Sequence, residues 1–198
     1  FPAHAIALAA PEVPLEARDA VLELGTRHGL LRAAAFTSEE MRSALGSGML
    51  GGVDLLGINI DEAAAAAGAP GEGERASAIV EAAVARLRKA NAGMIVTVTA
   101  GERGSWCWDG LLLGHRPKCS AQVASTAGAG DAHLAGMIVG MAAGLPPGEA
   151  HELAGLVAGL SVTSADTINR DICRESLRAF AAECAAHLSE SVRSLMEE

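Results

Sequence analysis

The pattern of apolar and polar positions divides the first half of the chain into alternating short strands and longer helices. The expected strands are residues 6–10, 30–36, 53–58 and 94–99, and the expected helices are 15–28, one that starts with a cap and acidic first turn at residues 37–40, 63–67 and 74–91. In the first of these helices, Val21, Leu22 and Leu24 lie on one side and Gly29 supplies the stop. Alternation of this kind predicts an α/β fold with a mostly parallel sheet and helices on both faces.

The pattern changes after the fourth strand. Residues 105–108 and 111–113 flank the turn dipeptide Asp109-Gly110, which predicts an antiparallel hairpin. Long helices are then expected at residues 131–143, 149–164 and 174–196. A loop is expected at residues 68–73.

Composition is that of a globular protein. Half of the 198 residues are apolar and a fifth are charged, so we predict one α/β domain over residues 1–198. Twenty-four acidic residues against 15 basic ones give a net charge of −9. Together with the lack of a basic cluster, this charge argues against a nucleic-acid partner.

The cysteines and the apolar segments indicate in which cellular compartment we expect the protein. Cys107, Cys119, Cys173 and Cys184 show no zinc-ligand spacing, so we interpret them as reduced thiols of a cytoplasmic protein. The longest apolar stretch, residues 134–145, is too short to cross a bilayer, and we expect no membrane partner and no signal peptide. Because the chain begins at Phe1 rather than Met, we expect it to be part of a longer protein.

The most informative segment is Ser125-Thr126-Ala127-Gly128-Ala129-Gly130-Asp131, directly before an apolar helix. Glycines at a helix start let the backbone approach an anion, which the free N–H groups and the helix dipole then stabilise. The dinucleotide and P-loop motifs are excluded, because His133 occupies the third glycine position and no Gly-Lys-Ser/Thr follows. An ordinary turn with a stabilising carboxylate explains the segment equally well when it is taken alone.

Two other motifs favour the anion-binding interpretation over the ordinary turn. The segment Thr126–Asp131, followed by Ala-His-Leu-Ala-Gly, resembles the C-terminal signature of the ribokinase-like (PfkB) carbohydrate kinases. Asn59-Ile60-Asp61-Glu62 resembles the Asn-x-x-Glu motif of that family, and Thr99–Gly104 resembles its Thr-x-Gly-x-x-Gly nucleotide loop. All three follow in the family's order, and the residues around Leu160–Asn169 are similar to the pseudouridine kinase branch.

The resemblance implies a three-layer ribokinase-like fold and ATP-dependent phosphotransfer to a hydroxyl of a small-molecule sugar or nucleoside. It implies that Asp131 is the catalytic base and that the backbone of Gly128, Ala129 and Gly130 forms an anion hole. It further implies the other site residues. These are Thr99, Gly101, Gly104, Thr126 and Asn59 for the nucleotide, and Asn59 and Glu62 for Mg²⁺.

The chain departs from the family in two respects. Ser125 replaces a carboxylate that helps many members to bind a monovalent cation, so we expect weak activation by potassium. The chain resembles only the C-terminal two-thirds of a family member, without the N-terminal sugar-binding residues and lid. We therefore expect the 198-residue chain alone not to phosphorylate a sugar at a useful rate. Which sugar or nucleoside is the acceptor, and whether the protein forms a homodimer, are left open.

Two other functions remain open. One is a kinase for a vitamin or hydroxymethylpyrimidine-type alcohol on the same fold, and the other is a non-catalytic family member that binds or regulates. The remaining conspicuous residues have structural interpretations. We expect His133 to be a helix-surface or packing residue, and Gly136, Gly140 and Gly144 to mark a close helix–helix or helix–sheet contact.

Overall fold

The computed structural model describes residues 5–11, 13–68, 75–119 and 121–197, which form six strands and eight α-helices. The described chain falls into two compact units. The first comprises Phe1–Val98 with Trp108–Leu113, and the second comprises Thr99–Cys107 with Gly114–Glu198. Beyond Gly68, the loop predicted at residues 68–73 lies outside the described residues.

Parallel strands form the sheet of the first unit. Its strands, in spatial order, are β1 (Ile6–Ala9), β2 (Leu31–Ala34), β3 (Leu55–Asn59) and β4 (Ile95–Thr99). β1 pairs with β2 and β2 with β3 in parallel register, and the Ile95 N–H donates to the Asp54 carbonyl 2.9 Å away. This is the parallel arrangement that the strand–helix alternation predicts.

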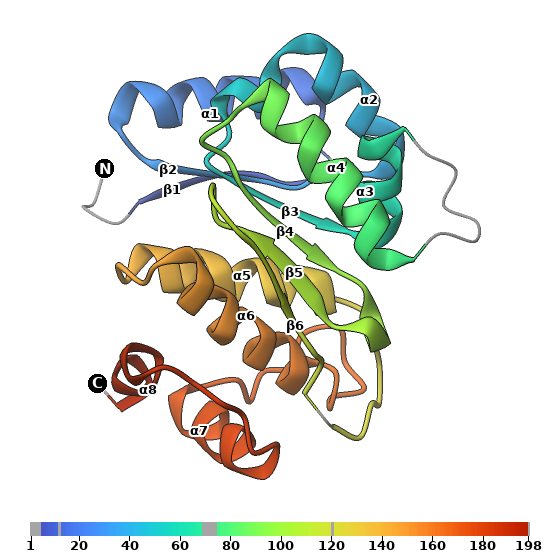
Figure 1. Ribbon diagram of the computed structural model, residues 1–198. Helices are drawn as coiled ribbons and strands as arrows, with labels where there is room; N and C mark the ends of the chain where they lie inside the picture. Colours follow the sequence, from blue (N-terminus) through green and yellow to red (C-terminus); the bar gives the residue numbers. More distant parts are fainter. Residues whose placement is uncertain (1–4, 12, 69–74, 120, 198) are drawn as a thin grey trace. The chain divides into compact units, whose positions relative to one another are not determined.

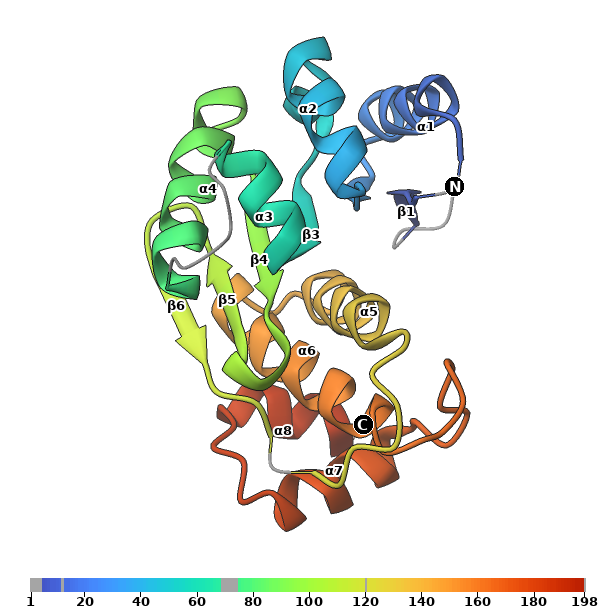
Figure 2. The same cartoon turned by 90° about the vertical axis from the view of Figure 1, so that its right-hand side faces the viewer.

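Four helices lie along one face of these strands (Figures 1 and 2). They are α1 (Leu15–His28), α2 (Ser38–Ser47), α3 (Ile60–Ala67) and α4 (Ala76–Ala90). α1 ends at Gly29, which takes the left-handed conformation (φ 63°), as the sequence predicts. Buried Arg18 of α1 forms an ion pair with Glu40 of α2, so a charged contact joins these two helices.

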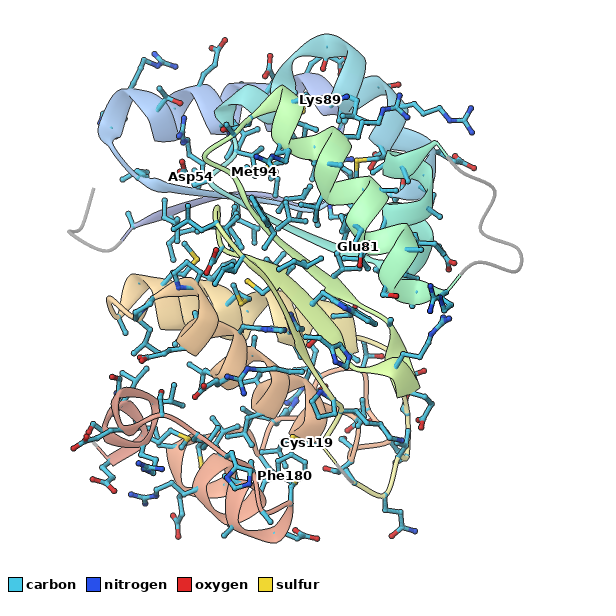
Figure 3. The ribbon with its side chains drawn as sticks, viewed as in Figure 1. Asp54, Glu81, Lys89, Met94, Cys119 and Phe180 are labelled. Carbon is cyan, nitrogen blue, oxygen red and sulfur yellow. The ribbon has the colours of Figure 1, made fainter. Side chains whose placement is uncertain are left out.

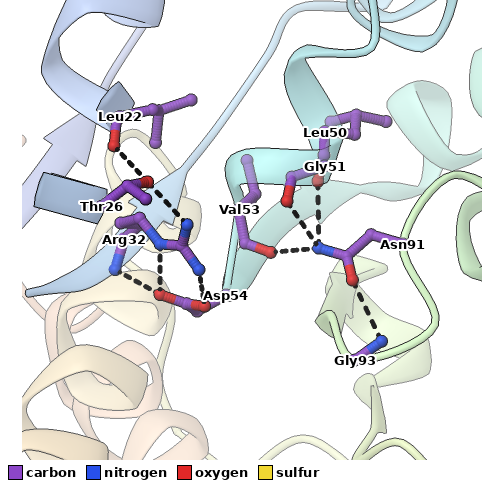
Figure 4. A network of polar contacts seen from close by, with 9 residues as sticks. All are labelled: Leu22, Thr26, Arg32, Leu50, Gly51, Val53, Asp54, Asn91 and Gly93. Carbon is purple, nitrogen blue, oxygen red and sulfur yellow. Dashed lines mark hydrogen bonds and ion pairs between the residues drawn. The ribbon is translucent and has the colours of Figure 1, made fainter. Parts of the chain in front are cut away.

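A polar network fixes the connection that leads into β3 (Figure 4). The Asp54 carboxylate accepts hydrogen bonds from the Arg32 backbone N–H and from Nε, both at 2.9 Å. The Asn91 side chain donates to the carbonyls of Leu50 (3.1 Å) and Val53 (2.8 Å). These bonds set where β3 begins and therefore where its last residue, Asn59, is placed.

The remaining strands form a hairpin, β5 (Ser105–Trp108) and β6 (Leu113–Arg116), whose turn Trp108–Leu113 belongs to the first unit. The second unit also contains four helices, which are α5 (Ala129–Ala142), α6 (Pro147–Ser161), α7 (Arg174–Glu183) and α8 (Glu190–Glu197). The hairpin is confirmed, but its second strand, β6, begins at Leu113, which is the last residue of the strand predicted at residues 111–113. Asp109 Oδ1 accepts the N–H groups of Leu111 (2.8 Å) and Leu112 (2.7 Å), and this side-chain turn lengthens the loop.

The single helix predicted at residues 174–196 is wrong. α7 ends at Glu183 with Cys184 as its C-cap, and Ala185 takes a left-handed φ of 49°. The N–H groups of Ala185 and Ala186 donate back to Ala182 and Ala181, which is the hydrogen-bond pattern of a Schellman motif. Because this position carries alanine instead of glycine, no helix-stop signal is present in the sequence.

Close packing of α5 on α6 confirms the helix–helix contact expected at Gly136 and Gly140, whereas the expectation is wrong for Gly144, which has a left-handed φ of 87° and nothing within 4 Å of its Cβ position. A Cβ built on Gly136 would lie 2.6 Å from the Ala154 Cα, and one on Gly140 would lie 2.9 Å from the Ala150 Cα. Phe180 of α7 and Cys119 lie together in a C-terminal apolar cluster (Figure 3). Among the described helices, none is long and apolar enough to span a membrane.

Candidate functional site

The start of α5 is a glycine turn. Gly128 precedes the helix with φ 78° and ψ 0°, a left-handed conformation that disfavours other residues. A Cβ at this position would lie 2.4 Å from the carbonyl oxygen of Thr167. Both the backbone angles and the space therefore require glycine here.

The N-terminus of α5 has no side-chain cap. The first bond of the helical pattern is donated by the Ala132 N–H to Gly128 (2.9 Å), and the Ala129 N–H makes a longer bond to Thr126 (3.3 Å). The N–H groups of Gly130 and Asp131 precede the helical ladder and point out of its positive end. Exposed Asp131 lies in this first turn, as predicted. We call Gly128–Asp131 the open start of α5.

The residues before the open start are held to the end of α6. The N–H groups of Ala124 and Ser125 both donate to the Val162 carbonyl, at 2.8 and 3.2 Å. Ser125 Oγ accepts the Ala127 N–H at 3.3 Å, so this hydroxyl takes part in a local turn. Thr126 is exposed beside the open start.

The loop Thr99–Gly104 is a compact turn after β4. The Ala100 N–H donates to the Gly104 carbonyl at 2.9 Å, and Gly101 has a left-handed φ of 56° with nothing near its Cβ position. A Cβ on Gly104 would lie 2.1 Å from the carbonyl oxygen of Arg116. Turn geometry thus explains both glycines of the predicted nucleotide loop and leaves open space at Gly101.

The Asn59–Glu62 motif forms the N-terminal cap of α3. Asn59 Oδ1 accepts the N–H groups of Asp61 (2.9 Å) and Glu62 (3.0 Å), and Glu62 Oε2 accepts the Asn59 N–H (2.8 Å). This is a reciprocal capping box. Capping accounts for the residue types and the spacing of this motif without a metal.

The predicted residues are divided between the two units. Asn59 and Glu62 belong to the first, whereas the 99–104 loop and the open start of α5 belong to the second. Within the described ranges, no three His, Cys, Asp or Glu side chains gather as a metal-binding group. The metal role of Asn59 and Glu62 therefore stays a prediction.

A buried polar cluster of the second unit was not predicted. Ser105 Oγ and His151 Nε2 lie 2.7 Å apart, and the rings of His151 and His133 meet edge-on at 5.5 Å. Burial lowers the pKa of His133 to about 4. Burial, with nearby positive groups, lowers that of His151 to about 3. His133 is a packing residue, in agreement with its expected role. The sequence signal for His151 was its place beside the apolar stripe of α6.

A cavity of about 480 Å³ also lies in the second unit, between the segment before Ser125, the end of α6 and α7. Its size falls within the range of small-molecule sites. The lining residues are Ala121, Gln122, Val123, Ala124, Leu160, Thr163, Ser176, Ala179, Phe180 and Glu183.

Comparison with known families and structures gives a consistent result. Residues 6–172 match the family model described as pfkB family carbohydrate kinase. No curated protein sequence matches the chain. Solved structures do, and three of them are described next.

Ribokinase from Cryptococcus neoformans var. grubii in complex with ADP is 20% identical, with a TM-score of 0.70 over 89% of this chain and 59% of its own. Adenosine kinase from Sinorhizobium meliloti is 24% identical, with a TM-score of 0.69 over 91% of this chain and 54% of its own. Phosphofructokinase-2 from Escherichia coli in complex with potassium is 18% identical, with a TM-score of 0.71 over 90% of this chain and 56% of its own.

These similarities confirm the ribokinase-like α/β fold that the motifs imply. The chain spans little more than half the length of each of the three solved chains. The similarity to the pseudouridine kinase branch stays a prediction.

Proposed function

The chain belongs to the pfkB family of carbohydrate kinases, and we propose that the protein containing it transfers the γ-phosphoryl group of ATP to a hydroxyl of a sugar or nucleoside. The observation that carries this proposal is the open start of α5, where uncapped N–H groups and the exposed Asp131 carboxylate meet. An anion cradle beside a base is what phosphoryl transfer requires.

Asp131 acts as the base in this proposal. Its carboxylate accepts the proton of the acceptor hydroxyl while the hydroxyl oxygen forms a bond to the γ-phosphorus and the bond to the β-phosphate bridging oxygen breaks, releasing ADP. The backbone N–H groups of Gly128, Ala129 and Gly130 stabilise the charge on the transferred group. The long Ala129–Thr126 bond is weak enough to be exchanged for such a contact.

The remaining residues hold the nucleotide and its metal. Thr99, Gly101 and Gly104 provide the loop at which the nucleotide lies, and exposed Thr126 contacts its phosphates. The turn at Gly101 supports this role, because no atom lies close to its Cβ position.

Asn59 and Glu62 bind Mg²⁺, largely through water. The capping box uses Glu62 Oε2 as an acceptor for the Asn59 N–H and is compatible with a metal held through water. When bound, Mg²⁺ neutralises phosphate charge. Ser125 cannot replace a cation-binding carboxylate, so strong potassium activation is not part of the proposal.

The replacement Asp131→Asn in the full natural protein tests the function. It keeps the size and the first-turn position of the side chain but removes the base. Turnover should fall by about 10²–10⁴-fold. Stability should change by less than about 1 kcal/mol. Nucleotide affinity should stay the same or improve, since a negative charge near the γ-phosphate has been removed.

The assay is acceptor-dependent ADP release with ATP and Mg²⁺, over a panel of sugars, nucleosides and hydroxymethylpyrimidine-type alcohols. Activity restricted to the last class would replace the proposed acceptor. Turnover of Asp131→Asn within threefold of wild type would remove Asp131 from the mechanism. ATP binding without transfer to any acceptor would favour a binding or regulatory family member.

A further inference from the structure

Three buried polar side chains from three different elements meet inside the second unit. Ser105 begins β5, His133 lies in α5 and His151 lies in α6, with exposed fractions of 7%, 2% and 2%. The Ser105 Oγ to His151 Nε2 distance of 2.7 Å is that of a good hydrogen bond. The His151 and His133 rings are in edge-on contact.

This cluster is not needed for packing alone. Burying a hydroxyl and two imidazoles requires desolvation that a hydrogen bond only partly offsets, and apolar side chains of similar volume avoid it. A directional bond does supply one thing that apolar contacts do not, which is a fixed position for the atoms it joins.

The cluster is joined through the chain to both parts of the proposed site. Ser105 follows Gly104, whose carbonyl closes the 99–104 loop by accepting the Ala100 N–H. His133 follows Asp131 by two residues on α5. α6 also contacts the α5 backbone closely at Gly136, so α6 is a common support for the loop and for the helix.

We propose that His151 is a positioning residue whose hydrogen bond to Ser105 holds the Thr99–Gly104 loop in its nucleotide-binding conformation. The inference rests on the proposed function. The bond fixes the residue at which the loop joins β5, and the packing of His151 on His133 ties that point to the helix that carries Asp131. Without the bond, the loop opens more often and the nucleotide must order it on binding.

Two variants break the bond in the full natural protein. Ser105→Ala removes the hydroxyl and keeps the fold, while His151→Leu removes the imidazole. His151→Gln can place a nitrogen near the Nε2 position and should restore the wild-type behaviour in part. Leu177→Ala is the control, because it creates a cavity in the C-terminal cluster and lowers stability without touching the Ser105–His151–His133 cluster.

The first measurement is hydrogen exchange of the nucleotide-free protein. Amides of residues 99–104 should exchange about fivefold faster in Ser105→Ala and His151→Leu, which is the size expected for one lost buried hydrogen bond. In Leu177→Ala they should exchange as in wild type. Equal protection of this loop in all variants overturns the proposal, whatever the protein catalyses.

The second measurement separates positioning from general destabilisation. The dissociation constant and KM for ATP should rise about fivefold in both bond-breaking variants, while KM for the acceptor stays constant. His151→Gln should recover most of this loss. A wild-type protein that binds no ATP refutes the proposed function and this role together. Normal ATP binding by Ser105→Ala refutes the positioning role alone.

Discussion

The starts of α3 and α5 carry two of the three family motifs, but they are built in opposite ways. At α3, Asn59 and Glu62 satisfy the backbone N–H groups of the first turn with their own side chains. At α5, Gly128 replaces a capping side chain and the first-turn N–H groups are left uncapped. The positive end of a helix dipole is present in both, yet only the start of α5 has backbone donors available for an anion.

The difference shows that a motif at a helix start does not by itself define a binding site. What decides is whether the side chains of the motif use the N–H groups or leave them free. The capping box stabilises α3, whereas Gly128 gives up that stabilisation and provides no side-chain acceptor for the first-turn N–H groups. Changing one helix start at a time tests this comparison.

The largest effect is expected from closing the open start. Gly128→Ala forces a left-handed alanine and brings its Cβ against the Thr167 carbonyl. We expect a loss of about 2–4 kcal/mol in the free energy of unfolding, from strain and overlap together. ATP affinity should fall at the same time. Chemical denaturation and nucleotide titration of the full protein measure both.

Gly130→Ala is the matched control for this change. Gly130 lies inside the helix, and nothing lies within 4 Å of its Cβ position. Alanine there should raise stability by about 0.5–1 kcal/mol, because glycine is unfavourable within a helix. Similar losses in both variants would contradict the special geometry assigned to Gly128.

Acid should weaken the surroundings of α5 more than those of α3. His133 and His151 are held neutral in the folded state, with pKa values lowered to about 4 and about 3, and Arg116 and His115 add positive charge near His151. In the unfolded chain these two histidines take up a proton near pH 6.5. The free energy of unfolding is therefore unaffected by them above that pH and falls as the pH drops toward 4. The slope approaches about 1.4 kcal/mol per pH unit for each histidine.

Hydrogen exchange at pH 7 and pH 5 measures this difference between the two helix starts. Protection should fall with pH in α5 and α6. A His133→Gln variant should show a shallower dependence on pH. If α3 loses protection as steeply as α5, the buried histidines are not the cause.

The smallest effect is expected from removing the N-terminal cap of α3. Asn59→Ala removes the acceptor for the Asp61 and Glu62 N–H groups and should lower stability by about 1 kcal/mol. Asn59→Ser retains a cap and should recover most of the loss. If Asn59 also binds the metal, Asn59→Ser should still require more Mg²⁺ for half-maximal activity. An unchanged Mg²⁺ requirement would leave capping as its role.

Local signals made part of the structure predictable. The apolar period and Gly29 gave the bounds of α1, and the glycines of residues 128–130 marked the start of α5 to within two residues. These features depend on backbone conformation and on contacts a few residues apart, which the order of residue types specifies.

The roles of several side chains were not predictable in this way. Ala185 ends α7 in a conformation that alanine rarely takes, since Leu188 and Leu195 on the other side of the break pack against the same apolar cluster as α7. The bond between Ser105 and His151 joins residues 46 positions apart.

The sequence by itself determined the order of strands and helices from β1 to α6 and the glycine-rich start of α5, because local backbone preferences set them. Only the tertiary structure decided that Thr167 lies over Gly128. It also decided that two histidines are buried and that one of them bonds Ser105, the residue after the 99–104 loop. Such contacts depend on how distant segments pack, and no local pattern encodes the loss of water that packing imposes on a polar group.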